Sequence, residues 1–329
     1  MAADTGTMSG RTGAAAGAVA ATAGQTDASS RTPLARRPRR RGAAGQAAVL
    51  RLLPGPVLVI AVVVLSLWVL LPLAYVFLAS INSDLAIAQG GIWPQTVHLD
   101  NYLKLWTTIQ LGPAMVNSIL VAGATAFVAA VLAVFTAFVL VRFQFRGRTT
   151  ILRGLLVLQS IPSTLLLLPL FVVFSSAATY VGVQIVGTRW GLFLTYLTFA
   201  LPFATWTMVT YLRGLPRELE EAGRIDGASN LRLLTNIILP LSWPGVVVAG
   251  IFSFLLGWND VAFANVLTQP STRTAAIALQ KFSAATEGGS IPLYGQMMAA
   301  SLVCAVPVVT LYLVFQRYLV GGLTAGSVK

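Results

Sequence analysis

The hydropathy pattern divides most of the chain into six long apolar stretches joined by short polar segments. Their approximate limits are 57–80, 114–141, 151–174, 189–212, 244–268 and 295–320. Each stretch is nearly free of charge, and at about 1.5 Å per residue each can cross a hydrocarbon core of about 30 Å as a helix. Backbone amides in lipid must be satisfied within the segment. The pattern therefore predicts an all-α, polytopic membrane protein with six transmembrane helices.

The first 50 residues have a different composition from the rest of the chain. They are mainly Ala, Gly, Thr, Ser and Arg, with too few large apolar side chains to offset chain entropy. We expect residues 1–50 to form a disordered tail and residues 51–329 a transmembrane domain. An arginine run at 36–41 allows two interpretations of the first apolar stretch, an export signal or a retained helix. Its 24 residues exceed the apolar core of a signal peptide, which favours a retained helix.

The composition and the charge distribution support a membrane protein and predict its orientation. Hydrophobic residues make up 56% of the chain and charged residues 10%, whereas soluble domains carry about 25% charge. The net charge is +12, but residues 1–51 contribute half of it, so no nucleic-acid partner is expected. If the N-terminus is cytoplasmic, 18 of the 22 Lys and Arg lie on the inner side. This asymmetry predicts that both termini are cytoplasmic.

The chain lacks the residues that several kinds of membrane chemistry require. A single cysteine, Cys304, and a single histidine, His98, exclude disulfide frameworks and Cys/His metal clusters, so no metal site is expected. A membrane-embedded enzyme would need paired acids or a Ser/His pair at membrane depth. An autonomous secondary transporter would usually show an internal repeat and more ionisable groups within the spans. Neither pattern is visible.

The segment 213–243, expected on the inner side, differs from the other connections because it is long and charged. Pro216 suits a first helical turn, and three glutamates then follow near the helix N-terminus, where the macrodipole favours negative charge. The helix should break at Asp226 and Gly227, because glycine permits a left-handed backbone. A second short helix should begin near 228–230.

Apolar residues recur every three positions through this segment. They are Leu219, Ala222, Ile225, Ala228 and Leu231. The stripe is typical of a docking element that needs a partner, with the flanking charges setting its register. A solvated loop without a partner is the alternative.

A motif in the same segment resembles that of a known family. Glu221-Ala222-Gly223 is followed after three residues by Gly227, and after nine more by Ile237-x-Leu239-Pro240. This spacing is similar to the EAA loop of permease subunits in ATP-binding-cassette importers. The extended form resembles the carbohydrate-uptake branch, in particular the smaller permease of maltose-type systems. Gly223 is a departure, since the family usually has alanine there, and it lowers helix propensity by roughly 1 kcal/mol.

Three further segments resemble the same family, in the same order along the chain. They are Pro94 with Asn101-Tyr102, Trp258-Asn259-Asp260, and the C-terminal segment 316–329. The resemblance covers most of residues 55–329. It implies a plasma-membrane protein of a prokaryote with the six-helix importer permease fold. Permeases for other solutes share the shorter motif, so a non-sugar solute remains an alternative to a sugar.

The resemblance also implies partners and site residues. The partners are a second related permease, two ATPase subunits, an extracytoplasmic solute-binding protein, a sugar substrate and membrane lipid. ATP and Mg would be held by the ATPase subunits, because no G-x-x-x-x-G-K-[ST] loop occurs in this chain. The chain itself would bind no cofactor and would not be an enzyme. The residues implied in coupling to the ATPase are Glu220, Glu221, Ala222, Gly223, Ile225, Asp226, Gly227, Leu239 and Pro240.

Polar residues within the spans are costly and are candidates for the transport pathway or its gate. They are Asn117, Gln159, Asn259 and Asp260, with Trp258 included through the motif. For Asp260, the one acid in a predicted span, both a gate role and sugar contact are possible.

Two segments are expected on the outer side. The loop 269–292, with Arg273, Lys281 and Glu287, resembles the family's contact with the binding protein, and an ordinary exposed loop is the alternative. The segment 99–106 has helical apolar spacing and predicts either an interfacial amphipathic helix or a small core-packing helix.

Overall fold

The computed structural model describes residues 55–282, 286–287 and 291–324. The predicted disordered tail 1–50 lies outside the described residues, as do the last residues of the C-terminal segment, 325–329. Within the described part, six helical segments are long and apolar enough to cross a membrane. They are Gly55–Ser80, Leu111–Arg142, Ser163–Val181, Arg189–Arg213, Asn230–Asn259 and Tyr294–Tyr318. The prediction of a helical, six-span protein is therefore confirmed.

The chain divides into two units, Met1–Val62 and Val63–Lys329. Of the first unit the structure describes only the start of helix α2 (Gly55–Ser80). The other elements lie in the second unit. They are α3 (Asp84–Ala88), α4 (Asp100–Thr108), α5 (Leu111–Arg142), α6 (Arg148–Ser160), η1 (Ser163–Leu166), α7 (Leu167–Val181), α8 (Arg189–Arg213), α9 (Glu218–Ile225), α10 (Asn230–Leu233), η2 (Leu234–Ile238), α11 (Leu239–Asn259), α12 (Ala262–Leu267), α13 (Ala275–Phe282), β1 (Thr286–Glu287), β2 (Ile291–Pro292) and α14 (Tyr294–Thr324).

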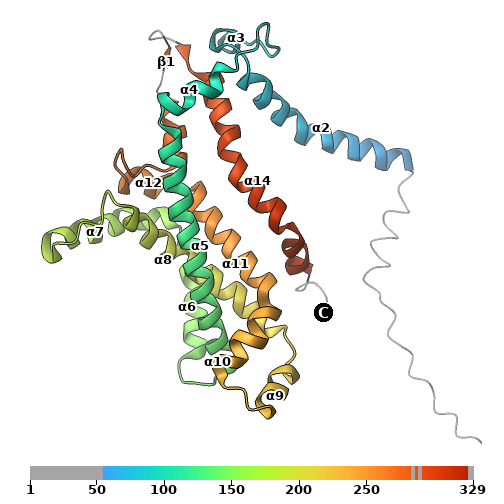
Figure 1. Cartoon of the computed structure of the whole chain (residues 1–329), viewed down its shortest axis with the longest axis vertical. Helices are drawn as coiled ribbons and strands as arrows, with labels where there is room; N and C mark the ends of the chain where they lie inside the picture. Colours follow the sequence, from blue (N-terminus) through green and yellow to red (C-terminus); the bar gives the residue numbers. More distant parts are fainter. Residues whose placement is uncertain (1–54, 283–285, 288–290, 325–329) are drawn as a thin grey trace, which may run out of the picture. The chain divides into compact units, whose positions relative to one another are not determined.

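Three helices, α5, α8 and α11, form the core of the second unit (Figure 1). Alanines at most 1% exposed line their contacts: Ala129, Ala133, Ala137, Ala200, Ala204 and Ala249. Small side chains let the backbones approach closely, which favours helix association in a membrane through van der Waals packing. Where α11 meets α8, a Cβ on Gly257 would lie 2.9 Å from the Tyr196 ring. The close approach therefore depends on glycine as well as alanine.

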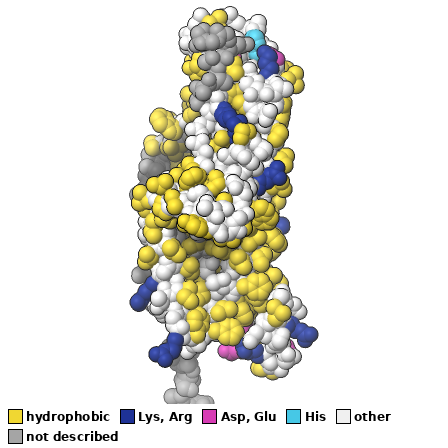
Figure 2. Space-filling model, turned by 90° about the vertical axis from the view of Figure 1, so that its left-hand side faces the viewer, with side chains coloured by type: hydrophobic (Ala, Val, Ile, Leu, Met, Phe, Trp, Pro, Cys, Tyr) yellow, Lys and Arg dark blue, Asp and Glu magenta, His cyan; other side chains and the backbone are white. Residues whose placement is uncertain are grey.

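Hydrophobic side chains also cover much of the outside of the second unit. Figure 2 shows them over a large part of one face, between groups of Lys and Arg side chains. Phe127 of α5, Val173 of α7 and Trp190 of α8 are 71%, 62% and 71% exposed. A helical surface of this kind is suited to contact with lipid or with another apolar helix.

The third span differs from the prediction of one helix over 151–174. The helix α6 ends at Ser160, the chain is extended at Ile161, and a new helical segment begins after Pro162. Proline lacks an N–H and disfavours a helical conformation in the residue before it, which explains the break. The segment long enough to span is therefore Ser163–Val181, and α6 is a separate helix.

The fifth span also differs from the predicted limits of 244–268. The helix that begins at Asn230 continues through the π-helical segment η2 into α11 and ends at Asn259. Asp260 is extended and is followed by the short helix α12. The expected short second helix of the 213–243 segment is thus the start of this span. The expectation that Asp260 lies inside a span is corrected in the same way, since it lies at a break between helices.

The two ends of the second unit carry different polar contacts. At one end, which we call the α4 end, α3, α4 and the first turns of α5, α8 and α14 meet. At the opposite end, the α9 end, the last turns of α5 and α8 meet α9. The segments 99–106 and 269–275 lie at the α4 end, and 213–230 lies at the α9 end.

The segment 99–106 packs into the protein at the α4 end. Asn101 and Leu105 of α4 are buried, and the Asn101 amide donates hydrogen bonds of 3.0 Å to the carbonyl oxygens of Ser80 and Asn82. Leu105 belongs to a core cluster with residues of α13 and α14. The apolar positions Leu99, Leu103 and Trp106 are exposed, so α4 packs through one face while the predicted apolar stripe lies on the surface. Both predicted alternatives for this segment stay open.

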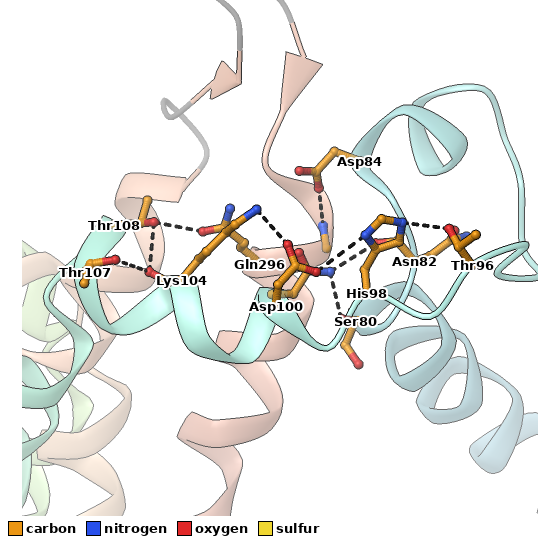
Figure 3. Close-up of polar contacts among 12 residues, drawn as sticks. Ser80, Asn82, Asp84, Thr96, His98, Asp100, Lys104, Thr107, Thr108 and Gln296 are labelled. Carbon is orange, nitrogen blue, oxygen red and sulfur yellow. Dashed lines mark hydrogen bonds and ion pairs between the residues drawn. The ribbon is translucent and has the colours of Figure 1, made fainter.

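Charged and polar side chains complete the α4 end (Figure 3). The backbone N–H of Gly295 donates to Asp84 at 2.7 Å, and the Thr108 hydroxyl donates to Gln296 at 2.9 Å, so both contacts hold the start of α14. On the solvent side, Lys104 pairs with Asp100 at 2.7 Å. The hydrogen bond from Lys104 lowers the pKa of Asp100 from its usual value.

A test of this packing is the substitution Gly295→Ala. An added Cβ would lie 2.5 Å from the Asn101 amide nitrogen and 2.8 Å from the Asn82 carbonyl oxygen. We expect overpacking to lower the free energy of unfolding by about 1–3 kcal/mol, measured as thermal unfolding in detergent. The control is Gly154→Ala in α6, where nothing lies within 4 Å of the added atom. Equal stability of the two variants would contradict the packing described here.

Candidate functional site

The helix α9 and the turn that follows it have the geometry that the sequence predicts. The helix begins at Glu218, after Pro216, and its first turn contains three glutamates. It ends in a Schellman motif: the N–H of Ala228 donates to Gly223 at 2.9 Å, and the N–H of Gly227 donates to Arg224 at 3.1 Å. Gly227 has a φ of 78°, which glycine adopts without steric cost. The predicted break at Gly227 is confirmed.

The helix that follows is capped by Ser229, whose hydroxyl accepts a hydrogen bond from the N–H of Arg232. From Asn230 it continues to Asn259 over 30 residues, about 45 Å at 1.5 Å per residue. The α9 turn is therefore attached directly to the long helix that contains α11.

The apolar stripe predicted for this segment lies on the surface. Leu219, Ile225 and Leu231 are 44%, 86% and 63% exposed. Ala222 is also exposed and Ala228 is half-buried. Large apolar side chains grouped on a charged, projecting helix are typical of an interaction surface.

Two residues of the predicted coupling set face inward instead. The Glu220 side chain is 9% exposed and forms an ion pair with Arg142, the last residue of α5. Gly223 is buried, and a Cβ there would lie 2.7 Å from both Leu233 and Ile237. The departure from alanine at Gly223 therefore accompanies close packing of α9 on the helix that follows it.

The remaining residues of that set lie on or near the surface. Glu221 and Asp226 are exposed, Leu239 is half-buried, and Pro240 is exposed in the first turn of α11. Arg142 is one of the 18 Lys and Arg residues expected on the inner side, and the sequence predicts no separate role for it. Its place in the last turn of a span, where the helix dipole favours a cation, was the available signal.

A cavity of about 600 Å³ lies between α8 and α11. It is lined by Ser163, Tyr196, Phe199, Ala200, Phe203, Phe252, Ser253, Leu255, Leu256, Asn259, Asp260 and Phe263. Its phenylalanines form two pairs, Phe199 with Phe263 and Phe203 with Phe252, each with ring centroids 5.1 Å apart. An apolar lining with a few polar groups is the usual form of a small-molecule site.

Asp260 is the polar centre of this cavity wall. Its carboxylate accepts hydrogen bonds of 2.9 Å from the Tyr196 hydroxyl and the N–H of Ala264, so it caps α12 and ties that helix to α8. Asn259 lines the cavity beside it and is exposed. The sequence predicted both residues as pathway candidates, and the structure brings them together with Tyr196 and the phenylalanine pairs.

Comparison with known proteins identifies the family of this chain. Residues 129–324 match the family described as binding-protein-dependent transport system inner membrane component. The chain belongs to this family.

Individual relatives agree with this assignment. The trehalose transport system permease protein SugB of Mycobacterium tuberculosis (strain CDC 1551 / Oshkosh) is 32% identical over 263 residues, 80% of this chain and 93% of that protein. The trehalose/maltose transport system permease protein MalG of Thermococcus litoralis (strain ATCC 51850 / DSM 5473 / JCM 8560 / NS-C) is 30% identical, covering 83% and 96%. A chain of a bacterial ABC transporter involved in the import of the acidic polysaccharide alginate has the same fold, with a TM-score of 0.68, 21% identity and coverage of 80% and 95%.

The other pathway candidates of this permease-family chain lie outside the cavity lining. Trp258 is 6% exposed and stacks on Phe254 at 5.4 Å between centroids. Gln159 is exposed on α6. Asn117 is 2% exposed at the α4 end.

Asn117 fixes a loop rather than facing the cavity. Its amide nitrogen donates to the carbonyl oxygens of Ser271 and Arg273 at 3.1 and 2.9 Å, and its oxygen accepts from Arg189 at 2.7 Å. The N–H of Ala275 donates to the Ser118 hydroxyl at 2.8 Å. These bonds attach the start of the 269–292 loop to α5 and α8.

The predicted binding-protein contacts lie along this loop. Arg273 is half-buried, Lys281 is exposed at the end of α13, and Glu287 lies in β1, which pairs antiparallel with β2. Their role in contacting a binding protein stays a prediction.

The turn at Gly227 gives a direct test of the α9 geometry. Gly227→Val should strain the turn, because a left-handed conformation costs an L-residue about 1–2 kcal/mol. We expect faster amide hydrogen exchange in peptides covering 223–228. Gly227→Asn is the matched control, since asparagine tolerates the left-handed region. Unchanged exchange in the valine variant would contradict the described turn.

Proposed function

We propose that this chain is a permease subunit of an ATP-driven sugar importer that works with a separate binding protein. Several relatives are named as permeases for trehalose, maltose or diacetylchitobiose, which supports a sugar as the solute. Two separate ATPase subunits bind ATP with Mg and hydrolyse the ATP. A second related permease completes the pathway. The α9 end, with its arginine-rich connections, faces the cytoplasm together with both termini.

One observation carries this proposal: a continuous helix joins the docking surface to the cavity. The helix Asn230–Asn259 starts beside the exposed stripe of α9 and ends at Asn259, which lines the cavity. A rigid element of this length transmits a displacement at one end to the other. Movement of α9 by an ATPase subunit would therefore shift the wall of the cavity, which is the requirement for alternating access.

The surface of α9 supports docking to another protein chain. Ile225 is 86% exposed. Removing an apolar side chain of this kind from water stabilises the complex with the partner that covers it. Glu221, exposed on the same helix, is available for an ion pair with that partner. The apolar stripe would supply the buried area of the interface, and the carboxylate would fix the position of α9 along the partner's surface.

The cavity supports a neutral, hydroxyl-rich solute. Phenyl rings offer apolar faces to the C–H groups of a sugar ring, and Asn259 offers both donors and an acceptor to its hydroxyls. Since the Asp260 carboxylate already accepts hydrogen bonds from Tyr196, Phe263 and Ala264, it holds the wall of the cavity in shape.

Docking through α9 is tested by Ile225→Asp. Burying a carboxylate in an apolar contact is strongly unfavourable. We expect the variant to insert in the membrane, and we expect the amount of ATPase subunit that copurifies with it to fall at least tenfold. Val97→Asp is the control, because Val97 is 64% exposed at the α4 end. Wild-type recovery of the ATPase with the Ile225 variant would exclude docking through this stripe.

Solute binding in the pathway is tested in proteoliposomes that hold the complete complex. Uptake of trehalose, maltose and diacetylchitobiose is measured with the binding protein and ATP, and an amino acid serves as the non-sugar comparison. Phe252→Ala and Asn259→Ala should each lower uptake about tenfold, as expected when about 1.4 kcal/mol of interaction is lost. Phe127→Ala, on the exposed face of α5, should leave uptake unchanged. If the amino acid is taken up and none of the three sugars is, a sugar importer is excluded.

A further inference from the structure

A single arginine joins three helix ends at the α9 end of the protein. Arg142 is the last residue of α5, and its side chain is 6% exposed. Its guanidinium donates a hydrogen bond of 3.1 Å to the carbonyl oxygen of Leu212, in the last turn of α8. The same nitrogen, Nη2, pairs with Glu220 of α9. Arg142 therefore contacts α8 and α9 while belonging to α5.

The ion pair with Glu220 is hard to break. Both side chains are at most 9% exposed, so separating them would leave two charges without compensation in a poorly solvated site. An apolar contact, by comparison, is non-directional and permits sliding. The ion pair holds its two charged groups at contact distance. The pair therefore resists separation of α9 from the ends of α5 and α8.

The pair is a single-point contact rather than a fork. The Arg142 Nε and Glu220 Oε1 atoms are buried, and neither has a hydrogen-bond partner among the described residues. Glu220 is therefore held by an ion pair with one nitrogen, Nη2, which also donates a hydrogen bond to Leu212. A bidentate arginine would fix the carboxylate plane as well as its position. A contact through one nitrogen lets α9 turn about that point while its distance from α5 and α8 is kept.

The two neighbouring glutamates of α9 thus face different environments. Glu221 is exposed, whereas Glu220 is turned toward Arg142. The chain also links α9 to α11 through the Gly227 turn, and α11 and α8 form opposite walls of the cavity. With the ion pair, a displacement of α9 reaches both walls.

We propose that the Arg142–Glu220 ion pair is a positioning pair for coupling: it makes α5 and α8 follow α9, so that both walls of the cavity move when the ATPase subunits close. This inference rests on the proposed function of α9. It assigns Glu220 to a contact inside the permease and leaves docking to the exposed apolar stripe and Glu221.

The test uses the assembled complex with its ATPase subunits and binding protein in lipid nanodiscs. The variants are Glu220→Gln and Arg142→Gln, with Glu218→Gln as the matched control, because Glu218 is an exposed glutamate on the same helix. The ratio of hydrolysis stimulated by the loaded binding protein to basal hydrolysis is measured, together with sugar taken up per ATP in proteoliposomes. We expect this ratio to fall about tenfold in both variants, within the usual range of coupling energies, and to stay at the wild-type value in the control.

Assembly is measured on the same samples by size-exclusion chromatography, because a single variant leaves one buried charge unpaired. If the single variants do not assemble, the stimulation ratio is measured on the double variant Arg142→Met with Glu220→Met, since an apolar replacement of a buried pair is often neutral for stability.

A low stimulation ratio in an assembled complex supports the proposal. A wild-type ratio in any assembled variant overturns it, and so does failure of the double variant to assemble, which would show a purely structural role. Absence of stimulation in the wild-type complex would instead reject the proposed function.

Discussion

The close approach of α5, α8 and α11 is the constraint on which the rest of the structure depends. In a membrane the hydrophobic effect does not drive helices together, so van der Waals contact between small side chains has to do so. On α8, Ala200 and Ala204 pack in the core, and Ala200 also lines the cavity beside Phe199 and Phe203. One helix therefore provides both a tight interface and an aromatic wall, and the cavity arises where alanine packing gives way to phenylalanine.

Polar contacts at the two ends hold this core in different ways. At the α4 end, uncharged amides bond to backbone carbonyls: Asn101 holds the end of α2 and Asn117 holds the loop before α13. Each such bond joins an uncharged amide to a backbone carbonyl and gives a fixed attachment. At the α9 end, a buried ion pair carries the contact between α5 and α9. The two ends of the second unit therefore differ in the chemistry of their contacts, with amide-to-carbonyl bonds at the α4 end and a buried ion pair at the α9 end.

The break at Asp260 shows how a membrane protein uses an acid without exposing a charge to lipid. Its carboxylate accepts two backbone N–H groups at the start of α12 and the Tyr196 hydroxyl. The exposed backbone at the helix break is thereby satisfied, as it must be wherever a helix is interrupted at membrane depth. The same break lies beside Asn259, so the feature that stabilises the fold also places a polar group in the cavity lining.

The sequence by itself determined the features that depend on neighbouring residues. Apolar length defined the spans, and the glycine at 227 with Ser229 two residues later defined the turn and the next helix start, because caps and turns are local hydrogen-bond patterns. The motif around Glu221 was sufficient to indicate the family. The limits of the third and fifth spans were missed because long apolar stretches lie close together before and after Pro162 and Asp260. The few polar residues between them, among them Ser160, Ser163 and Asn259, did not divide the hydropathy pattern.

Only the tertiary structure decided which side chains meet. Asn117 lies 156 residues from Arg273 in the sequence, and Arg142 lies 70 from Leu212, so no local pattern indicates either contact. The inward direction of Glu220 and the outward direction of Glu221 follow from how α9 packs on the helix after it and pairs with Arg142, which helical periodicity alone leaves open. The cavity likewise depends on residues from α8, α11 and α12 coming together, because its shape is set by packing between helices that hydropathy treats as equivalent.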